Sequence, residues 1–194
     1  MTANTKRNKD PCTDLLTDKE YLEHMIPHHQ VAIDMSKELM KITTNPLMQH
    51  LCRKIIRLQS YEIWEMTMAK RNTFESPNDP MISDNSLVPT ILDTYESQNS
   101  VSKKGQCTSL FFHPKKHMKH MEHSNITDEV YLRHMIPHHQ VAVDMSKRLL
   151  LHTKNPYLIE FCKMLIIEQQ GEILYMNQLL DKSKNFVIHS NLLN

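Results

Sequence analysis

The chain has 194 residues, with 23 basic and 22 acidic side chains and a formal net charge of +1. This length suits one ordinary domain or two small ones, and the balanced charge gives no electrostatic footprint for nucleic acid or an anionic membrane. Two glycines against nine prolines favour an all-α fold, because a sheet protein would need many more glycine turns.

The chain begins with residues 1–16, which we expect to form a flexible arm. The first ten residues are polar and lack the apolar core of a secretory signal. No run anywhere approaches the roughly 18 apolar residues of a membrane span. As written, the sequence predicts a cytoplasmic or particle-associated protein without a membrane span.

A first helical hairpin is predicted over residues 17–72. Thr17 and Glu20 have the spacing of a capping box, which starts a helix running to about residue 42. Asn45 and Pro46 are the residue types preferred at an N-cap and at the first helical position, so a second helix begins there and runs to about residue 72. The short connection between the two helices predicts an antiparallel αα-hairpin.

The same pattern returns 110 residues later. Residues 73–126 are expected to form a long crossover linker, followed by a second hairpin over 127–182 and a tail over 183–194. Between residues 21 and 66, 25 of 46 positions match their partners in 131–176. A hairpin of amphipathic helices cannot bury its own apolar face, so the two copies should pair into a four-helix bundle about a pseudo-twofold axis.

The first helix of each hairpin carries the same nine residues, His-Met-Ile-Pro-His-His-Gln-Val-Ala, at 24–32 and 134–142. On a helical wheel the charged side chains fill one arc, and the histidines and Met25 lie on or near the opposite side, which faces the core. Ten of the 13 histidines fall in these two motifs and in residues 113–123. Histidine is therefore concentrated where a core is expected and in the linker.

The second helix of each hairpin places two polar residues inside its apolar face. They are Gln59 and Glu62 in the first hairpin, and Gln169 and Glu172 in the second. A buried carboxylate is costly unless it is paired or hydrogen-bonded. We therefore expect the glutamates to contact the histidines of the first helices and to hold them in place.

Two interpretations of the repeated residues remain open. Thioether sulfur and imidazole nitrogen together suit Cu(I), with Ag(I) as a mimic, because soft ligands select soft ions. The alternative is a metal-free structural or assembly bundle, in which histidine, glutamate and glutamine form a buried polar layer and methionines fill gaps. The candidate metal ligands are His24, Met25, His28, His29, Met35 and Met66, with their equivalents His134, Met135, His138, His139, Met145 and Met176.

The linker contains a second segment rich in histidine and methionine. If this segment is helical, several of these side chains share a face at metal-ligand spacing, and if it is extended it is still a local chelator. The alternative is a solvated polar linker. The candidate ligands in this segment are His113, His117, Met118, His120, Met121 and His123.

The four cysteines, Cys12, Cys52, Cys107 and Cys162, include no C-x-x-C pair. A zinc ribbon or a thioredoxin-type redox site is therefore unsupported. Cys52 and Cys162 are equivalent positions of the two repeats and lie on apolar helix faces. We expect both to be small buried hydrophobic residues.

The paired motifs, His-Met-Ile-Pro-His-His-Gln-x-Ala-x-x-Met followed by Gln-x-x-Glu-Ile-x-x-Met, resemble the family called domain of unknown function 305. The resemblance covers both hairpins. It implies a ferritin-like four-helix bundle and copper binding, in the bacterial periplasm, by the motif histidines and methionines. The chain departs from the family in Ser60, which stands where the second half has Gln170, in its long linker, and in the absence of the usual export signal.

No catalytic residue is predicted. A ferritin-like di-iron oxidase needs Glu-x-x-His pairs in the core, and no Glu-x-x-His occurs in the sequence. We therefore expect a non-enzymatic protein that sequesters, buffers or transfers copper, Cu(I) in particular, with another transition metal as the alternative. Its expected partners are metal ions, and a homo-oligomer or a protein partner is left open.

Overall fold

The computed structural model describes residues 9–74, 106–121 and 125–191. Within these ranges all regular structure is helical and there is no strand, which confirms the all-α prediction. The elements are α1 (Asp18–Met40), α2 (Pro46–Phe74), the short 3₁₀ helix η1 (Ser109–Phe112), α3 (Pro114–Met121), α4 (Asp128–Leu150) and α5 (Pro156–Asn191).

The helix starts follow the local sequence signals. At α1 the Glu20 N–H donates to Thr17 Oγ1 at 3.3 Å and the Thr17 N–H donates to Glu20 Oε2 at 2.9 Å, which completes the capping box. At α2 and α5, Asn45 and Asn155 each accept a hydrogen bond on Oδ1 from the N–H two residues on, both at 3.0 Å. Each short Asn-Pro connection therefore closes one hairpin.

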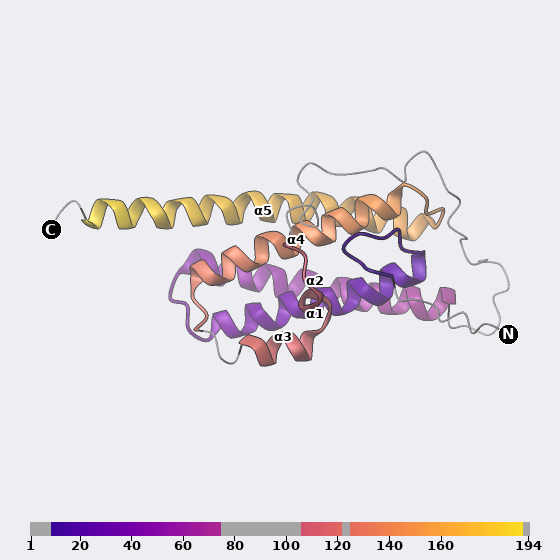
Figure 1. Cartoon of the computed structure of the whole chain (residues 1–194), viewed down its shortest axis with the longest axis horizontal. Coiled ribbons are helices and arrows are strands. Elements are labelled where there is room, and N and C mark those ends of the chain that lie inside the picture. The colour runs from indigo at the N-terminus through magenta and orange to yellow at the C-terminus, as the bar shows by residue number, and fades with distance from the viewer. Residues whose placement is uncertain (1–8, 75–105, 122–124, 192–194) are drawn as a thin grey trace.

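The two hairpins, α1 with α2 and α4 with α5, pack into one four-helix bundle. Figure 1 shows α1 and α2 side by side in purple, with α4 and α5 in orange to yellow packed over them. Two reciprocal hydrogen bonds join the repeats: Tyr21 with Ser146 at 2.7 Å, and Ser36 with Tyr131 at 2.6 Å. These pairs are repeat equivalents, so the halves are related by a pseudo-twofold axis within the chain.

The apolar core consists of two separate clusters of buried side chains. The first combines the N-terminal part of α1 with the C-terminal part of α4, and the second combines the C-terminal part of α1 with the N-terminal part of α4. The buried histidines of α1 and α4, and the buried glutamines of α2 and α5, fall between the stretches that supply the two clusters. The core is therefore apolar at both ends and polar at its centre.

Residues 9–16 were expected to be flexible, and the structure instead holds them against the bundle. Cys12 forms a disulfide with Cys107, 95 residues away. The backbone carbonyl of Pro11 accepts from Arg148 at 2.7 Å, and the carbonyl of Leu16 lies 2.8 Å from His152 Nε2. The sequence prediction was wrong for this stretch because three partners distant in sequence hold it. Residues 1–8 lie outside the described part of the chain.

The predicted linker also has ordered structure where it is described. The elements η1 and α3 pack against α1, and Phe111 and Phe112 of η1 belong to the first apolar cluster. Residues 75–105 and 122–124 of the predicted linker lie outside the described residues.

The last helix is longer than predicted. We expected it to end near residue 182 and to be followed by a tail, but α5 continues to Asn191 and its C-terminal part projects beyond the other helices in Figure 1. Residues 183–191 contain neither glycine nor proline, so no local signal stops the helix. Among the described helices, none is long and apolar enough to cross a membrane.

The pairs that join the repeats give a first prediction. Replacing Tyr21 by Phe leaves the buried Ser146 without its tyrosine partner, so the free energy of unfolding should fall by about 1–3 kcal/mol. Tyr131→Phe should have a similar effect at the equivalent position. Adding Ser146→Ala to Tyr21→Phe should cost little more, because both partners are then gone. Urea denaturation of the parent, the two single variants and the double variant measures these free energies. Tyr61→Phe, at an exposed tyrosine, is the control. Costs of the two substitutions that add strictly would contradict the prediction.

Candidate metal centre

The centre of the bundle is a layer of eight polar side chains, two from each long helix, which we call the polar layer. All except Glu62 are buried, and Glu62 is only 18% exposed. The members are His28 and His29 of α1, Gln59 and Glu62 of α2, His138 and His139 of α4, and Gln169 and Glu172 of α5. The repeated motifs therefore meet at one place.

The two glutamates contact one histidine each, as expected from the sequence. His29 Nε2 lies 3.0 Å from Glu62 Oε2, and His139 Nε2 lies 2.8 Å from Glu172 Oε2. Neither His29 nor His139 has a hydrogen-bond partner at Nδ1. The pair His139–Glu172 is a hydrogen bond, whereas Nε2 of His29 only lies close to Glu62. A carboxylate beside one ring nitrogen orients the ring of a metal-binding histidine.

Lys54 makes the second half of the layer different from the first. Its Nζ lies 3.3 Å from Glu172 Oε1 and 3.1 Å from Glu168 Oε2. Burial opposes ionisation of Glu172, but the hydrogen bond and charge of His139 and the charge of Lys54 outweigh it and hold the pKa of Glu172 below its ordinary value. Sequence reasoning missed Lys54. The available signal was a break in the repeat, since the equivalent position is Met164.

The innermost pair is His28 and His138, one from each repeat. Their rings stack with centroids 3.7 Å apart and an interplanar angle of 25°, and both side chains are fully buried. Burial, and then the charges of neighbouring histidines, hold the pKa of each well below its ordinary value. No partner meets hydrogen-bond geometry at either ring nitrogen of either histidine, although a contact with the backbone of His138 opposes the lowering of the pKa of His28. Both are therefore neutral rings with unused lone pairs.

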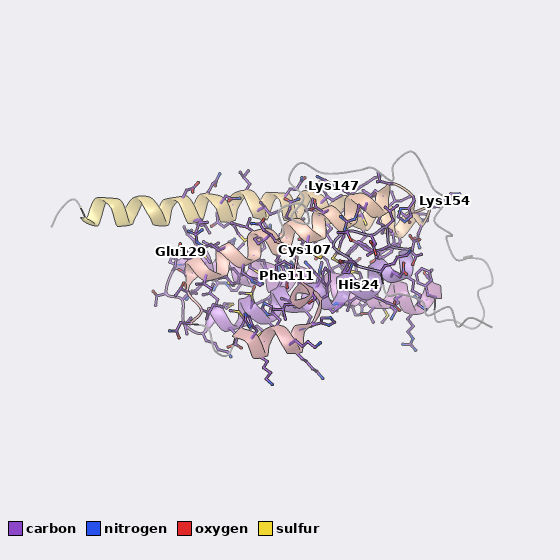
Figure 2. All side chains as sticks on the ribbon, in the orientation of Figure 1. His24, Cys107, Phe111, Glu129, Lys147 and Lys154 are labelled. Carbon is purple, nitrogen blue, oxygen red and sulfur yellow. A yellow bond between two sulfur atoms is a disulfide. The ribbon has the colours of Figure 1, made fainter. Side chains whose placement is uncertain are left out.

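An aromatic cap formed by Phe111 and Phe112 covers these rings on one side. The Phe111 ring centroid lies 5.0 Å from that of His138 and 5.1 Å from that of His134, both edge to face. The Phe112 centroid lies 5.3 Å from that of His28. Figure 2 shows Phe111 and Cys107 over the middle of the bundle. The cap was not predicted, although two adjacent phenylalanines in a polar linker were a visible signal.

The outer histidines of the motifs lie at the margin of the polar layer. His24 is half-buried, and burial lowers its pKa. Burial and the charge of His117 lower the pKa of His134 to about 3. His134 Nε2 lies 3.1 Å from His117 Nε2, so α3 adds one histidine to the set.

The linker candidates are divided rather than gathered into one local chelate. His117 is buried against His134, whereas His113 and His120 are exposed. Met118 is half-buried, and Met121 packs against the second apolar cluster. The spacing rule did not anticipate that one face of α3 would pack on α1 and separate these side chains. His123 lies outside the described residues.

The six candidate methionines of the two hairpins are all buried and lie in the two apolar clusters. Met25, Met66 and Met145 belong to the first cluster, and Met35, Met135 and Met176 to the second. Each cluster therefore holds two candidate methionines of one repeat and one of the other. Within the described residues, no three His, Cys, Asp or Glu side chains are arranged so that they could hold one metal ion.

The fold and the layer define a helical-bundle protein built from two repeats, with imidazoles at its centre and thioethers in the clusters on either side. The family model for the domain of unknown function 305 (DUF305) matches residues 18–180. The chain therefore belongs to the DUF305 family.

Several solved structures are similar to this chain. CopM in the Ag-bound form obtained by soaking is 29% identical, with a TM-score of 0.62, and the match covers 87% of this chain and 98% of that one. CopM in the Cu(I)-bound form is 28% identical, with a TM-score of 0.62, over 86% and 97%. A DUF305 fragment from Deinococcus radiodurans is 18% identical, with a TM-score of 0.59, over 85% and 95%, and it supports the fold alone.

One curated relative comes from a virus. Uncharacterized protein L153 of Acanthamoeba polyphaga mimivirus is 46% identical over 59 residues, which are 30% of this chain. The match spans 39% of the length of that protein.

The buried neutral histidines predict a pH dependence of stability in the absence of metal. The pKa of His134 is about 3 in the folded chain, against an ordinary value of 6.5, so between these values the unfolded chain binds more protons. The free energy of unfolding should therefore fall as the pH drops from 6.5 toward 3, and His28 and His138 act in the same direction. Each of these three histidines lowers the free energy of unfolding by up to about 1.4 kcal/mol per pH unit.

This dependence is best measured by urea denaturation between about pH 6.5 and 5, above the ordinary titration range of glutamate. His134→Gln should reduce the slope of the free energy of unfolding against pH by the contribution of one histidine, because glutamine binds no proton in this range. An unchanged slope in that variant would show that His134 does not titrate as a buried neutral ring.

Proposed function

We propose that this protein binds Cu(I) in the polar layer and sequesters, buffers or transfers it without catalysing a reaction. The observation that carries the proposal is the pair His28 and His138, which are fully buried with no hydrogen-bond partner at any of their four ring nitrogens. Buried polar atoms normally have partners, and those without one need a stated reason. A bound metal ion supplies that reason.

The charge state of the layer fits a metal cation. Because burial holds the pKa values of His28 and His138 low, their lone pairs are not blocked by protons at neutral pH. The glutamates lie beside Nε2 of His29 and His139, so Nδ1 is the ring nitrogen that has no contact with a carboxylate. Metal would enter without first displacing protons from His28 and His138.

Copper in its reduced state fits the ligand types better than a hard cation does. Imidazole and thioether are soft or borderline ligands, and thioethers in particular select Cu(I). Six candidate methionines are buried in the clusters on either side of the layer. Since no three His, Cys, Asp or Glu side chains of the described chain converge on one point, methionine sulfur or a change of imidazole rotamer would complete the coordination.

The similar structures support this proposal. CopM has been solved in Cu(I)-bound, Cu(II)-bound and Ag-bound forms, and it is 28–29% identical to this chain over most of both chains. Binding of the same ions here is an inference from that likeness together with the histidine layer. The disulfide between Cys12 and Cys107 supports a location that is oxidising for at least part of the protein's lifetime.

A metal-free scaffold is the second candidate, and one observation favours it. The contacts of His29 with Glu62 and of His139 with Glu172 already give half of the layer histidines a partner inside the protein. In that case the polar layer would determine which helices pair, and it would not bind a ligand.

Copper titration separates the two candidates. His28→Ala combined with His138→Ala should lower the number of tightly bound Cu(I) ions by at least one, because both innermost donors are lost. Anaerobic titration of the disulfide-bonded chain against a chromophoric Cu(I) chelator measures this number. The exposed His50→Ala is the matched control and should bind as the parent does.

Binding should also raise the thermal midpoint of the parent chain, since a ligand that binds only the folded state stabilises it. Uptake of Cu(I) that is unchanged in the double variant would contradict a site in the polar layer. No uptake by the parent, together with full stability after chelation, would establish the scaffold.

A further inference from the structure

A second group of metal-binding side chains lies beside the polar layer, around a surface cavity of about 630 Å³. The N-terminal segment, the first half of α1 and the segment around η1 form its walls. Both cysteines of the disulfide line it, together with His24 and His113. Both cysteines pack against the first apolar cluster, and neither belongs to the polar layer.

The four cysteines differ sharply in what can reach them. Cys52 and Cys162 are buried thiols, and burial raises their pKa to about 11 and about 12. Cys12 and Cys107 are only half-buried and line the cavity. Small thiols and metal ions therefore have access to Cys12 and Cys107, while the two buried thiols are shielded.

The two halves of the disulfide are anchored independently of the bond between them. On one side, the carbonyls of Pro11 and Leu16 contact Arg148 and His152, and Leu16 is buried in the first apolar cluster. On the other side, Phe111 and Phe112 fix η1, which begins two residues after Cys107. Breaking the bond would leave both thiols in place, facing each other across the cavity.

We propose that Cys12 and Cys107, when reduced, bind one Cu(I) ion as a pair of thiolates at the wall of this cavity, next to His24. Thiolates are soft ligands that suit Cu(I), and the site is distinct from the polar layer in its residues. The choice of Cu(I) as the ion rests on the proposed function. The pairing of the two thiols rests on the cavity and on the contacts that hold the segments around Cys12 and Cys107 in place.

The distance between the cysteines suits a chelate. Their Cα atoms are 6.0 Å apart. Metal–sulfur bonds of about 2.3 Å place two sulfur ligands within roughly 4.6 Å of each other. The sulfurs therefore have to separate by less than about 3 Å from a disulfide length of about 2.05 Å, which side-chain rotation can supply.

The chemistry balances with a thiol reductant. Two molecules of a small thiol reduce the Cys12–Cys107 disulfide, and they leave as their own disulfide while both cysteines gain a proton. Cu(I) then displaces those two protons and forms two copper–sulfur bonds. The imidazoles of His24 and His113 line the same cavity as the two cysteines.

The test compares oxidised and reduced protein under anaerobic titration with Cu(I) and a chromophoric chelator. The reduced chain should bind one more Cu(I) than the oxidised chain and show an ultraviolet thiolate-to-Cu(I) charge-transfer band. Cys12→Ser with Cys107→Ser should lose both the extra ion and the band. The matched variant Cys52→Ser with Cys162→Ser should keep both.

Other readouts keep the outcome decisive if the cysteine variant folds poorly. Reduced and oxidised parent chains differ only in the disulfide, and circular dichroism shows whether both are folded. The proposal would be overturned if the folded oxidised and reduced chains bound the same number of Cu(I) ions. It would also be overturned if the charge-transfer band were lost in the Cys52→Ser, Cys162→Ser variant. The His28→Ala, His138→Ala variant should keep the band even if it binds no ion in the polar layer, which separates failure of this site from failure of the proposed function.

Discussion

The structure depends on burying a polar layer at the centre of an otherwise apolar core. Removing imidazoles and a carboxylate from water is costly, and much of that cost is uncompensated at His28 and His138, which have no partner in the protein. The apolar clusters on either side, each with fully buried leucines and methionines, supply the opposing free energy. Two buried tyrosine–serine bonds, one on each side of the layer, join the two repeats.

The polar layer draws on two similar halves of the chain, but sequence differences between them make its two sides unequal. Glu62 and Glu172 occupy equivalent positions, yet Glu172 is more deeply buried and is the one that Lys54 contacts. The cap and α3 come from a single linker and cover the layer from one side, where His117 joins His134. The two copies of the motif therefore have different surroundings, and a metal ion would meet an asymmetric site.

The sequence carried the features that depend on local order and periodicity. Some signals lie within a single helix or turn, so their consequences could be predicted. They are the Asn-Pro turns, the Thr17 capping box, and the polar residues Gln59 and Glu62 on an apolar helix face. The disulfide between Cys12 and Cys107, the Phe111 cap and the division of the linker histidines depend on contacts across the fold. Periodicity holds no information about such contacts, which is why these features were missed.

The charge of the layer bears on which ion it could hold. His28 and His138 are neutral, and Lys54 contacts the ionised Glu172, so the negative charge of that carboxylate is already partly offset. The cost of burying an ion rises steeply with its charge, since the idealised Born cost scales with the square of the charge and is already of order 20 kcal/mol for a monovalent ion. A monovalent ion is therefore far less costly here than a divalent one. The same neutrality that destabilises the empty core in acid therefore favours a monovalent over a divalent ion under the proposed function.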